Sequence, residues 1–87
     1  MIQVVYSNYF LKSAKKLSQK QQIKLAELLE VLEENPFHNF LRTKLLTGQL
    51  TGFCSFRIAR DWRVIFQFIN PGKIKLIEIG HRKDIYK

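Results

Sequence analysis

The sequence predicts an α+β domain with elements in the order β-α-α-β-β-β, in which a helical hairpin packs on one face of a small, mainly antiparallel sheet of four strands. Two patterns predict this fold. Apolar residues recur at helical spacing up to residue 32, and apolar and polar residues alternate from residue 53 onward. Turn-forming residues separate the later runs closely enough for hairpins. With 87 residues, the chain has room for one domain, residues 1–87.

The first forty residues predict one strand and two helices. Residues 2–6 are β-branched and aromatic, and Ser7 or Asn8 can cap the helix that follows. The polar stretch from Ser18 to Gln22 is expected to break this helix. The Asn35-Pro36 pair ends the second helix, because proline disfavours helical backbone at the residue before it. The second helix places a stripe of four leucines toward the core: Leu25, Leu28, Leu29 and Leu32.

The second half of the chain changes from helical to strand-like spacing. Residues 37–52 hold turn-forming pieces around the apolar pair Leu45-Leu46, without a predicted strand. Three strand-like runs follow, at residues 53–59, 62–69 and 73–80. Arg60-Asp61 and Asn70-Pro71-Gly72 separate these runs, which predicts antiparallel hairpins.

Positive charge is concentrated in the second half of the chain. The formal net charge is +8, and residues 41–87 hold ten basic but only three acidic residues. All five arginines lie there. Such a one-sided distribution indicates a protein that binds a polyanion, most often a nucleic acid. A basic surface that serves only solubility is the alternative.

Cysteine content and hydropathy favour a cytoplasmic protein. Cys54 is the only cysteine, which excludes an internal disulfide and fits a reducing compartment. No signal peptide is expected, because Lys12, Lys15 and Lys16 interrupt the apolar start. No apolar run approaches the ~18 residues that a membrane span needs. The prediction is a soluble, intracellular protein.

Strand alternation places two arginines on the open face of the sheet. Trp62 and Phe66 share the face that is expected to meet the helices, and Arg63 lies on the opposite face. If the connection between the strands has an odd number of residues, Arg57 lies nearly opposite Arg63. Because like charges across a ladder destabilise a sheet, this pair indicates a site for an anion such as phosphate. The alternative is a set of surface ion pairs: Arg63 with Glu78, and Arg57 with Asp61 or Asp84.

The chain ends in a cluster of reactive side chains, GHRKDIYK. His81 and Arg82 emerge at the end of the last strand, and Tyr86 follows closely enough to curl back over the same surface. Arginines that stabilise a phosphorane, with a histidine and a tyrosine that move protons, are typical of a ribonuclease that uses no metal. No carboxylate cluster, Cys/His pattern or glycine-rich loop is present, so neither a metal nor another cofactor is expected.

Three stretches together resemble the RelE/ParE toxin superfamily: SFRI at residues 55–58, DWRVIF at residues 61–66 and GHRKDIY at residues 80–86. With Leu45, Gly48 and the order of elements, the resemblance covers essentially the whole chain. It implies a toxin of a toxin–antitoxin pair with the RelE-like fold. The RelE branch cuts messenger RNA in the ribosomal A site, with the 2′-hydroxyl of the RNA as nucleophile and a cyclic phosphate as product. The ParE branch inhibits DNA gyrase.

The resemblance also implies roles for single residues. Arg57 matches a basic position that stabilises charge on the scissile phosphate, and Arg63 matches a phosphate contact on the next strand. Arg82 matches the arginine proposed to protonate the leaving oxygen, and Tyr86 matches the tyrosine proposed as general base. His81 lies where relatives have lysine or histidine, and it completes the expected catalytic set. The neighbouring cations would favour the phenolate, since the usual pKa of tyrosine is about 10.

One residue departs from the pattern, since Ser55 occupies a position that is lysine in the best-described enzymes. Further phosphate contacts with RNA are expected from four cations: Lys44, Arg60, Lys83 and Lys87. The implied partners are messenger RNA, the ribosome with its 16S rRNA, and a RelB-like antitoxin that is acidic and partly disordered.

Two other functions remain open from the sequence. A ParE-like toxin would inhibit DNA gyrase without catalysis, and Tyr86 would then be dispensable. A simple nucleic-acid-binding module is the third possibility. It is weakened because the sheet arginines lack an exposed aromatic platform, which sheets that bind RNA generally show.

Overall fold

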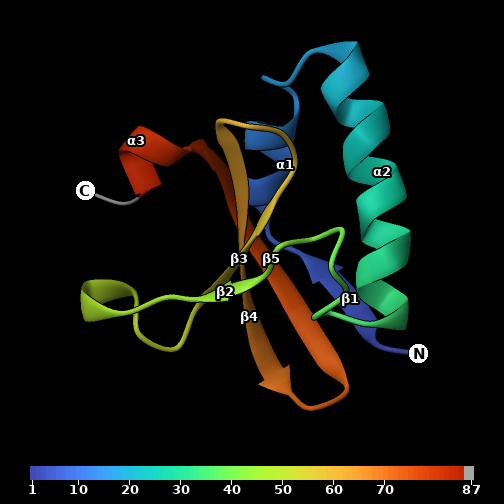
Figure 1. Cartoon of the computed structure of the whole chain (residues 1–87), viewed down its shortest axis with the longest axis vertical. Helices are drawn as coiled ribbons and strands as arrows, with labels where there is room; N and C mark the ends of the chain where they lie inside the picture. The colour runs from blue at the N-terminus through green and yellow to red at the C-terminus, as the bar shows by residue number, and fades with distance from the viewer. Residues whose placement is uncertain (86–87) are drawn as a thin grey trace.

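The computed structural model describes residues 1–85 and has a five-stranded mixed sheet with two main helices (Figure 1). The strands lie in the order β1-β5-β4-β3-β2. The elements along the chain are β1 (Gln3–Tyr6), α1 (Asn8–Ala14), α2 (Gln19–Glu34), β2 (Lys44–Leu45), the 3₁₀ turn η1 (Gly48–Leu50), β3 (Cys54–Arg57), β4 (Trp62–Asn70), β5 (Lys73–His81) and α3 (Arg82–Ile85). The α+β class and the helical hairpin are confirmed.

The helical hairpin owes its shape to two serine caps. The Ser7 hydroxyl accepts a hydrogen bond from the Phe10 N–H at the start of α1, as predicted. The Ser18 hydroxyl accepts from the Gln21 N–H while the Gln21 side chain accepts from the Ser18 N–H. This reciprocal pair starts α2 at Gln19. The predicted break between the two helices is confirmed, but it lies at residues 15–18 and does not extend to Gln22, because capping places the following polar residues in the first turn of α2.

Helix α1 also completes the hydrogen bonding of β5 beyond the end of β1. Strand β1 runs parallel to β5 and pairs with its first four residues, from Gln3↔Lys73 to Tyr6↔Leu76. Past that point the Ser7 hydroxyl donates to the Ile77 carbonyl at 2.7 Å. The Ser13 hydroxyl accepts from the Ile79 N–H at 3.0 Å. The N-cap serine and a serine within α1 thus satisfy backbone groups of β5 beyond the end of β1.

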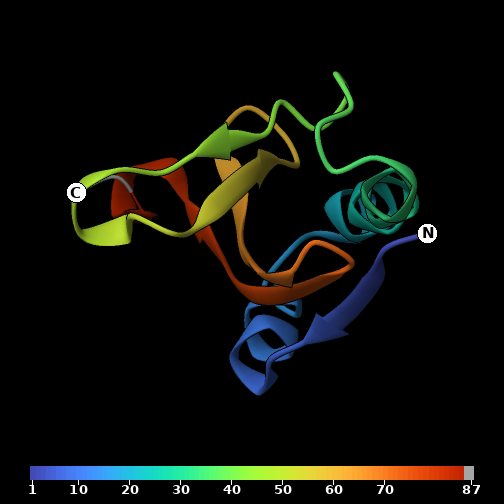
Figure 2. The ribbon, with the colours of Figure 1, turned by 90° about the horizontal axis from the view of Figure 1, so that it is seen from below.

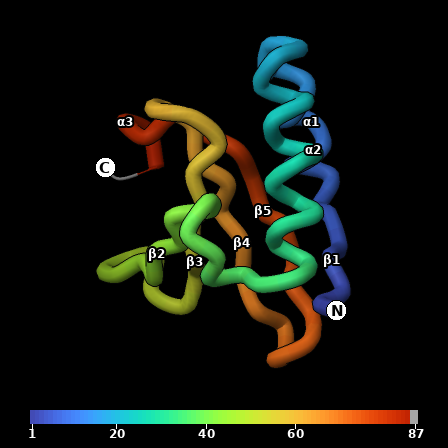
Figure 3. Tube along the Cα trace, turned by 45° about the vertical axis from the view of Figure 1, so that its right-hand side comes forward, coloured from blue at the N-terminus to red at the C-terminus, as the bar shows by residue number. Residues whose placement is uncertain are grey.

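The core lies between the helices and one face of the strongly twisted sheet (Figures 2 and 3). Leu25, Leu28 and Leu32 of α2 are buried there, as predicted. Strand alternation is also confirmed, since Val64 and Phe66 are fully buried on this face. Trp62 is half-buried and packs against the same core. The described residues include no helix long and apolar enough to cross a membrane.

Strand β2 was not predicted from the sequence, and the predicted sheet of four strands was therefore one strand too small. β2 pairs antiparallel with β3 through Lys44↔Ser55 and Leu45↔Cys54. Both residues of β2 are exposed, so no burial pattern marks them as a strand. The segment before it is held by Leu41, whose side chain is fully buried and whose carbonyl accepts from the Arg57 N–H at 2.8 Å. Tertiary contacts, rather than local sequence preference, define this strand.

Replacing Leu41 with alanine should lower the free energy of unfolding by about 2–5 kcal/mol, because it removes a fully buried side chain from the core. The matched control is Leu45→Ala, whose side chain is 71% exposed and should change stability by less than about 0.5 kcal/mol. Urea unfolding followed by the fluorescence of Trp62, the single tryptophan, measures both. Equal losses in the two variants would contradict the anchoring role of Leu41.

Candidate phosphate-binding site

The open face of the sheet carries the predicted arginine pair. Arg57 of β3 and Arg63 of β4 are directly opposite in the register, so both side chains leave the same face. Gly80 of β5 lies opposite Arg63 and continues the row. The predicted alignment of the two arginines is confirmed.

The turn between β3 and β4 holds these two like charges in place. The Ala59 carbonyl accepts a hydrogen bond from Arg57 Nε at 3.3 Å and from Arg63 Nη1 at 3.0 Å. Arg63 Nη1 also donates to the carbonyls of Arg60 at 3.0 Å and Trp62 at 3.2 Å. The partial negative charge of these carbonyls offsets repulsion between the guanidinium groups. Because a guanidinium has five N–H donors, contacts through one nitrogen are compatible with binding an anion.

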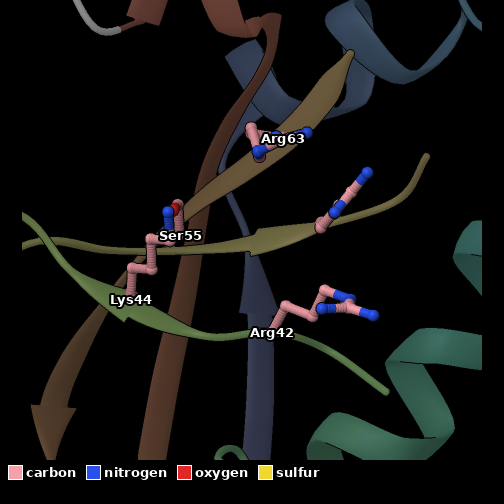
Figure 4. Close-up of a pocket in the computed structure, with 5 residues that line it drawn as sticks. Arg42, Lys44, Ser55 and Arg63 are labelled. Carbon is pink, nitrogen blue, oxygen red and sulfur yellow. The ribbon is translucent and has the colours of Figure 1, made fainter. Parts of the chain in front are cut away.

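Five side chains line a pocket of about 160 Å³ above the arginine pair, here called the basic pocket: Arg42, Lys44, Ser55, Arg57 and Arg63. Figure 4 shows Lys44 reaching from β2 toward Ser55, with Arg63 on the far side and Arg42 from the segment before β2. The lining contains four cations and no carboxylate. Such a concentration of one sign of charge is suited to a phosphate group.

Arg42 is the residue of the basic pocket that the sequence analysis did not single out. Its backbone φ is +51°, in the left-handed region that costs a non-glycine residue roughly 1–2 kcal/mol. The surrounding turn enforces this conformation, since the Arg42 N–H donates to the Asn39 carbonyl at 3.3 Å. Arg42 and Lys44 are two residues apart, and in an extended segment this spacing places two side chains on the same face. This spacing is the signal in the sequence that could have identified Arg42.

Ser55, which stands where the best-described enzymes have lysine, is buried and only 2% exposed. Its partner in the register is Lys44, whose side chain lines the same pocket. A cation therefore stands directly opposite the position where the resemblance expects lysine. Lys44 was predicted only as a general RNA contact, since strand β2 was not foreseen.

The tail folds back onto Gly80, the residue of β5 opposite Arg63. A Cβ atom on Gly80 would lie only 3.0 Å from Ile85 Cγ1, so Ile85 of α3 covers Gly80 closely. Arg82 holds α3 from the other side: its N–H donates to the Asp61 carbonyl at 2.8 Å, and its Nε lies 3.3 Å from Asp61 Oδ1. Tyr86 and Lys87 lie outside the described residues.

His81 stands at the junction of β5 and α3. Its ring meets the Trp62 ring edge-on, with centroids 5.6 Å apart. Its Nδ1 accepts from the Lys83 N–H at 3.2 Å, so a neutral imidazole carries its hydrogen on Nε2. His81 is thus arranged as a hydrogen-bond donor through Nε2.

The predicted residues thus fall into two groups. Arg57, Arg63 and Lys44 line the basic pocket, whereas His81 and Arg82 lie outside its lining, at the start of the tail. Arg60 and Lys83 are exposed. The sequence offered Asp61 as an ion-pair partner of Arg57. Within residues 1–85, Asp61 instead pairs with Arg82.

One other potentially reactive side chain, the thiol of Cys54, lies apart from this chemistry. Cys54 is buried on the core face, and its burial raises the pKa of its thiol. A buried thiol of this kind is a packing residue rather than a nucleophile. Residues 1–85 contain no group of three or more His, Cys, Asp or Glu side chains placed to hold a metal ion.

The fold is shared with solved structures of toxins. YafQ of Escherichia coli superposes with a TM-score of 0.78 at 22% identity, over 100% of both chains. The toxin of the RelE–RelB complex from the archaeon Pyrococcus horikoshii gives 0.76 at 23% identity, over 93% of this chain and 94% of that one. The YoeB–YefM toxin–antitoxin complex of Staphylococcus aureus gives 0.72 at 22% identity, over 90% and 93%. The architecture is therefore that of the RelE-like toxins.

The sequence places the chain within that class. It belongs to the ParE toxin family, whose model, described as the ParE toxin of the type II toxin–antitoxin system parDE, matches residues 4–86. The resemblance to the RelE/ParE superfamily is thus confirmed. A comparison with curated proteins found no significant match.

Arg42→Asn should leave the free energy of unfolding within about 0.5 kcal/mol, because asparagine tolerates the left-handed backbone well. It should weaken binding of single-stranded RNA, used as a polyanion, and reduce the slope of log affinity against log salt by about 0.7. Fluorescence anisotropy at several salt concentrations measures this slope. The matched control is Lys12→Asn, which removes one charge from α1. Equal slopes for the two variants would exclude a specific role for Arg42.

Proposed function

We propose that this toxin is an endoribonuclease that cuts messenger RNA in the ribosomal A site, by attack of the RNA 2′-hydroxyl on the adjacent phosphate. The observation that carries the proposal is the basic pocket, in which four cations and no carboxylate surround one small cavity. The RelE branch of the superfamily, which the C-terminal stretch GHRKDIY resembles, uses this reaction.

In the proposed reaction the scissile phosphate binds in the basic pocket. The 2′ oxygen forms a bond to phosphorus, and the bond from phosphorus to the 5′ oxygen breaks. Negative charge increases on the phosphoryl oxygens in the transition state. Arg57 and Arg63 stabilise that charge, and their anchoring to the Ala59 carbonyl means that little reorganisation is needed during reaction. Lys44, opposite Ser55, supplies the charge that relatives take from a lysine at that position.

Proton transfers complete the reaction. Tyr86 is the proposed base that removes the proton of the 2′-hydroxyl, and it follows directly after Ile85, which packs on Gly80 beside the arginines. Arg82 is the proposed donor to the leaving 5′ oxygen. His81 is an alternative donor, because its Nε2 carries a hydrogen in the neutral ring. The products are a 2′,3′-cyclic phosphate and a 5′-hydroxyl end.

Dependence on the ribosome follows from the chemistry of this site. Both arginine and tyrosine have pKa values far from neutrality, so each is a weak proton-transfer catalyst by itself. An RNA strand held and distorted in the A site would lower the entropic part of the barrier. Free RNA would gain no such advantage.

Mapping of 5′ ends in a reconstituted translation reaction tests the proposal. New ends should appear at A-site codons only in the presence of ribosomes. Arg63→Ala should lower the cleavage rate by about 10²–10³-fold, because it removes one charge-stabilising donor. Tyr86→Phe should lower it by about 10²–10⁴-fold, because the general base is lost. The control Lys12→Ala should cleave normally. Normal cleavage by folded Arg63→Ala and Tyr86→Phe would exclude the proposed mechanism.

Inhibition of DNA gyrase is the second candidate function. The observation that favours it is the family model itself, which is described as a ParE toxin. In that case the basic pocket would contact a DNA–protein assembly, and Tyr86→Phe would retain toxicity. Gyrase supercoiling measured at excess toxin separates the two functions, since unchanged supercoiling alongside messenger cleavage excludes gyrase as the target.

An antitoxin partner is part of the proposal. Two of the similar structures are toxin–antitoxin complexes, RelE–RelB and YoeB–YefM. For this chain, with its net charge of +8, the complementary partner is an acidic, partly disordered chain that folds over the basic pocket.

Such an antitoxin should compete with nucleic acid for the toxin. The free toxin should bind single-stranded RNA with an affinity that falls steeply with salt, and addition of the antitoxin should abolish this binding. Anisotropy of labelled RNA, with and without the partner encoded beside the toxin, measures both effects. An affinity independent of salt, or RNA that stays bound in the antitoxin complex, would contradict coverage of the basic pocket.

A further inference from the structure

A second cavity adjoins the basic pocket and has a different chemical character. Its volume is about 460 Å³, and it is here called the aromatic pocket after its lining: Phe37, His38, Asn39, Arg42, Thr43 and Lys44. Arg42 and Lys44 line both pockets. Figure 4 shows these two cations on one segment of the chain, and because both line both cavities, this segment lies between the two. A group attached to a phosphate in the basic pocket can therefore extend into the aromatic pocket.

Phe37 presents a ring that the fold itself does not bury. Its side chain is 57% exposed, although it follows Pro36, which is buried. The ring stacks on Phe68 of β4, with centroids 6.1 Å apart and planes at 18°. That contact fixes the orientation of Phe37 while more than half of its surface remains accessible. A fixed, exposed aromatic ring beside a phosphate site is the arrangement that stacks nucleobases.

The polar side chains around Phe37 supply an edge for hydrogen bonding. His38 Nδ1 accepts from the Phe40 N–H at 3.1 Å, so its neutral ring carries a hydrogen on Nε2. Asn39 is exposed and has both a donor and an acceptor on its amide. Both residues line the aromatic pocket together with Phe37, so a base in this pocket has hydrogen-bonding groups within the same lining.

The turn that carries these residues is already closed. The Phe37 N–H donates to Asn35 Oδ1 at 3.0 Å, and the Thr43 hydroxyl donates to the Pro36 carbonyl. Leu41, fully buried, anchors the same turn to the core. Binding of a ligand therefore requires little ordering of the chain, which preserves affinity.

From this geometry we infer that the aromatic pocket is a nucleobase subsite. It receives the base of a nucleotide that flanks the phosphate in the basic pocket, with Phe37 as the stacking platform and Asn39 and His38 along the edge of the base. The inference rests on the proposed function in one respect, namely that RNA is the ligand of the basic pocket. The sequence predicts no exposed aromatic platform on the sheet beside the arginines, and in this inference the turn before β2 supplies one through Phe37.

A binding assay without ribosomes tests the subsite. Two short single-stranded RNAs of equal charge are compared, one with all bases and one with abasic sugars. The wild-type protein should bind the base-bearing RNA about 5- to 100-fold more tightly, as expected for one stacked base. Phe37→Ala should remove most of this ratio and leave the affinity for abasic RNA unchanged. Phe37→Trp should restore the ratio and show fluorescence quenching with base-bearing RNA.

The matched control is Tyr9→Ala, which removes an aromatic ring that is 63% exposed on α1, outside both pockets. It should behave as wild type. Equal affinity of the wild type for the two RNAs would overturn the inference. A Phe37→Ala variant that loses affinity for both RNAs to the same extent would also overturn it. So would a Phe37→Ala variant that binds both RNAs as the wild type does but binds the antitoxin more weakly, since the pocket would then be a protein-docking surface.

The same variants in the ribosome reaction distinguish this inference from the proposed nuclease. Cleavage that depends on Arg63 but not on Phe37, with equal binding of base-bearing and abasic RNA, overturns the subsite and retains the nuclease. Tighter binding of base-bearing RNA that requires Phe37, in a protein that cuts no messenger, supports the subsite and excludes the nuclease.

Discussion

The pairing of β3 with β4 is the constraint on which the candidate site depends. Its register sets Arg57 directly opposite Arg63, an arrangement that repulsion between like charges opposes. The other face of the same strands carries Phe56 and Phe66, both fully buried. A slip of one residue would move these rings out of the core, so burial of the rings enforces the proximity of the arginines. The Ala59 carbonyl then relieves part of the repulsion by accepting from both.

The edge of the sheet adds the rest of the site. Leu41 packs into the core, and its carbonyl accepts from the Arg57 N–H, so the turn before β2 is attached to the arginine strand itself. This attachment brings Arg42 and Lys44 to the basic pocket and holds Arg42 in a left-handed backbone conformation. Strain of this size persists only where surrounding contacts over-determine the backbone, and it is common at functional sites.

Under the proposed function, the two adjoining pockets divide the roles of phosphate contact and base contact between them. Contacts with phosphate position a nucleic acid and carry no sequence information, whereas contacts with bases specify. The basic pocket has the chemistry of the first kind, and the aromatic pocket, with Phe37 and an amide from Asn39, has the chemistry of the second. A gyrase-directed toxin of the ParE family would need the charge but would gain little from a base-stacking ring. The aromatic pocket is thus a feature on which the two candidate functions differ.

Local patterns in the sequence determined the strands that carry the arginines, because alternation in β4 is enforced by residues only two apart. They likewise narrowed the cap of α1 to Ser7 or Asn8 and determined the end of α2 at Asn35. Tertiary structure alone decided that Lys44 pairs opposite Ser55 and that Ile85 closes on Gly80. These contacts join segments far apart in the chain or depend on a two-residue strand without a burial pattern of its own. Local sequence preferences carry no information about such contacts, because their free energy comes from packing that exists only after the core has formed.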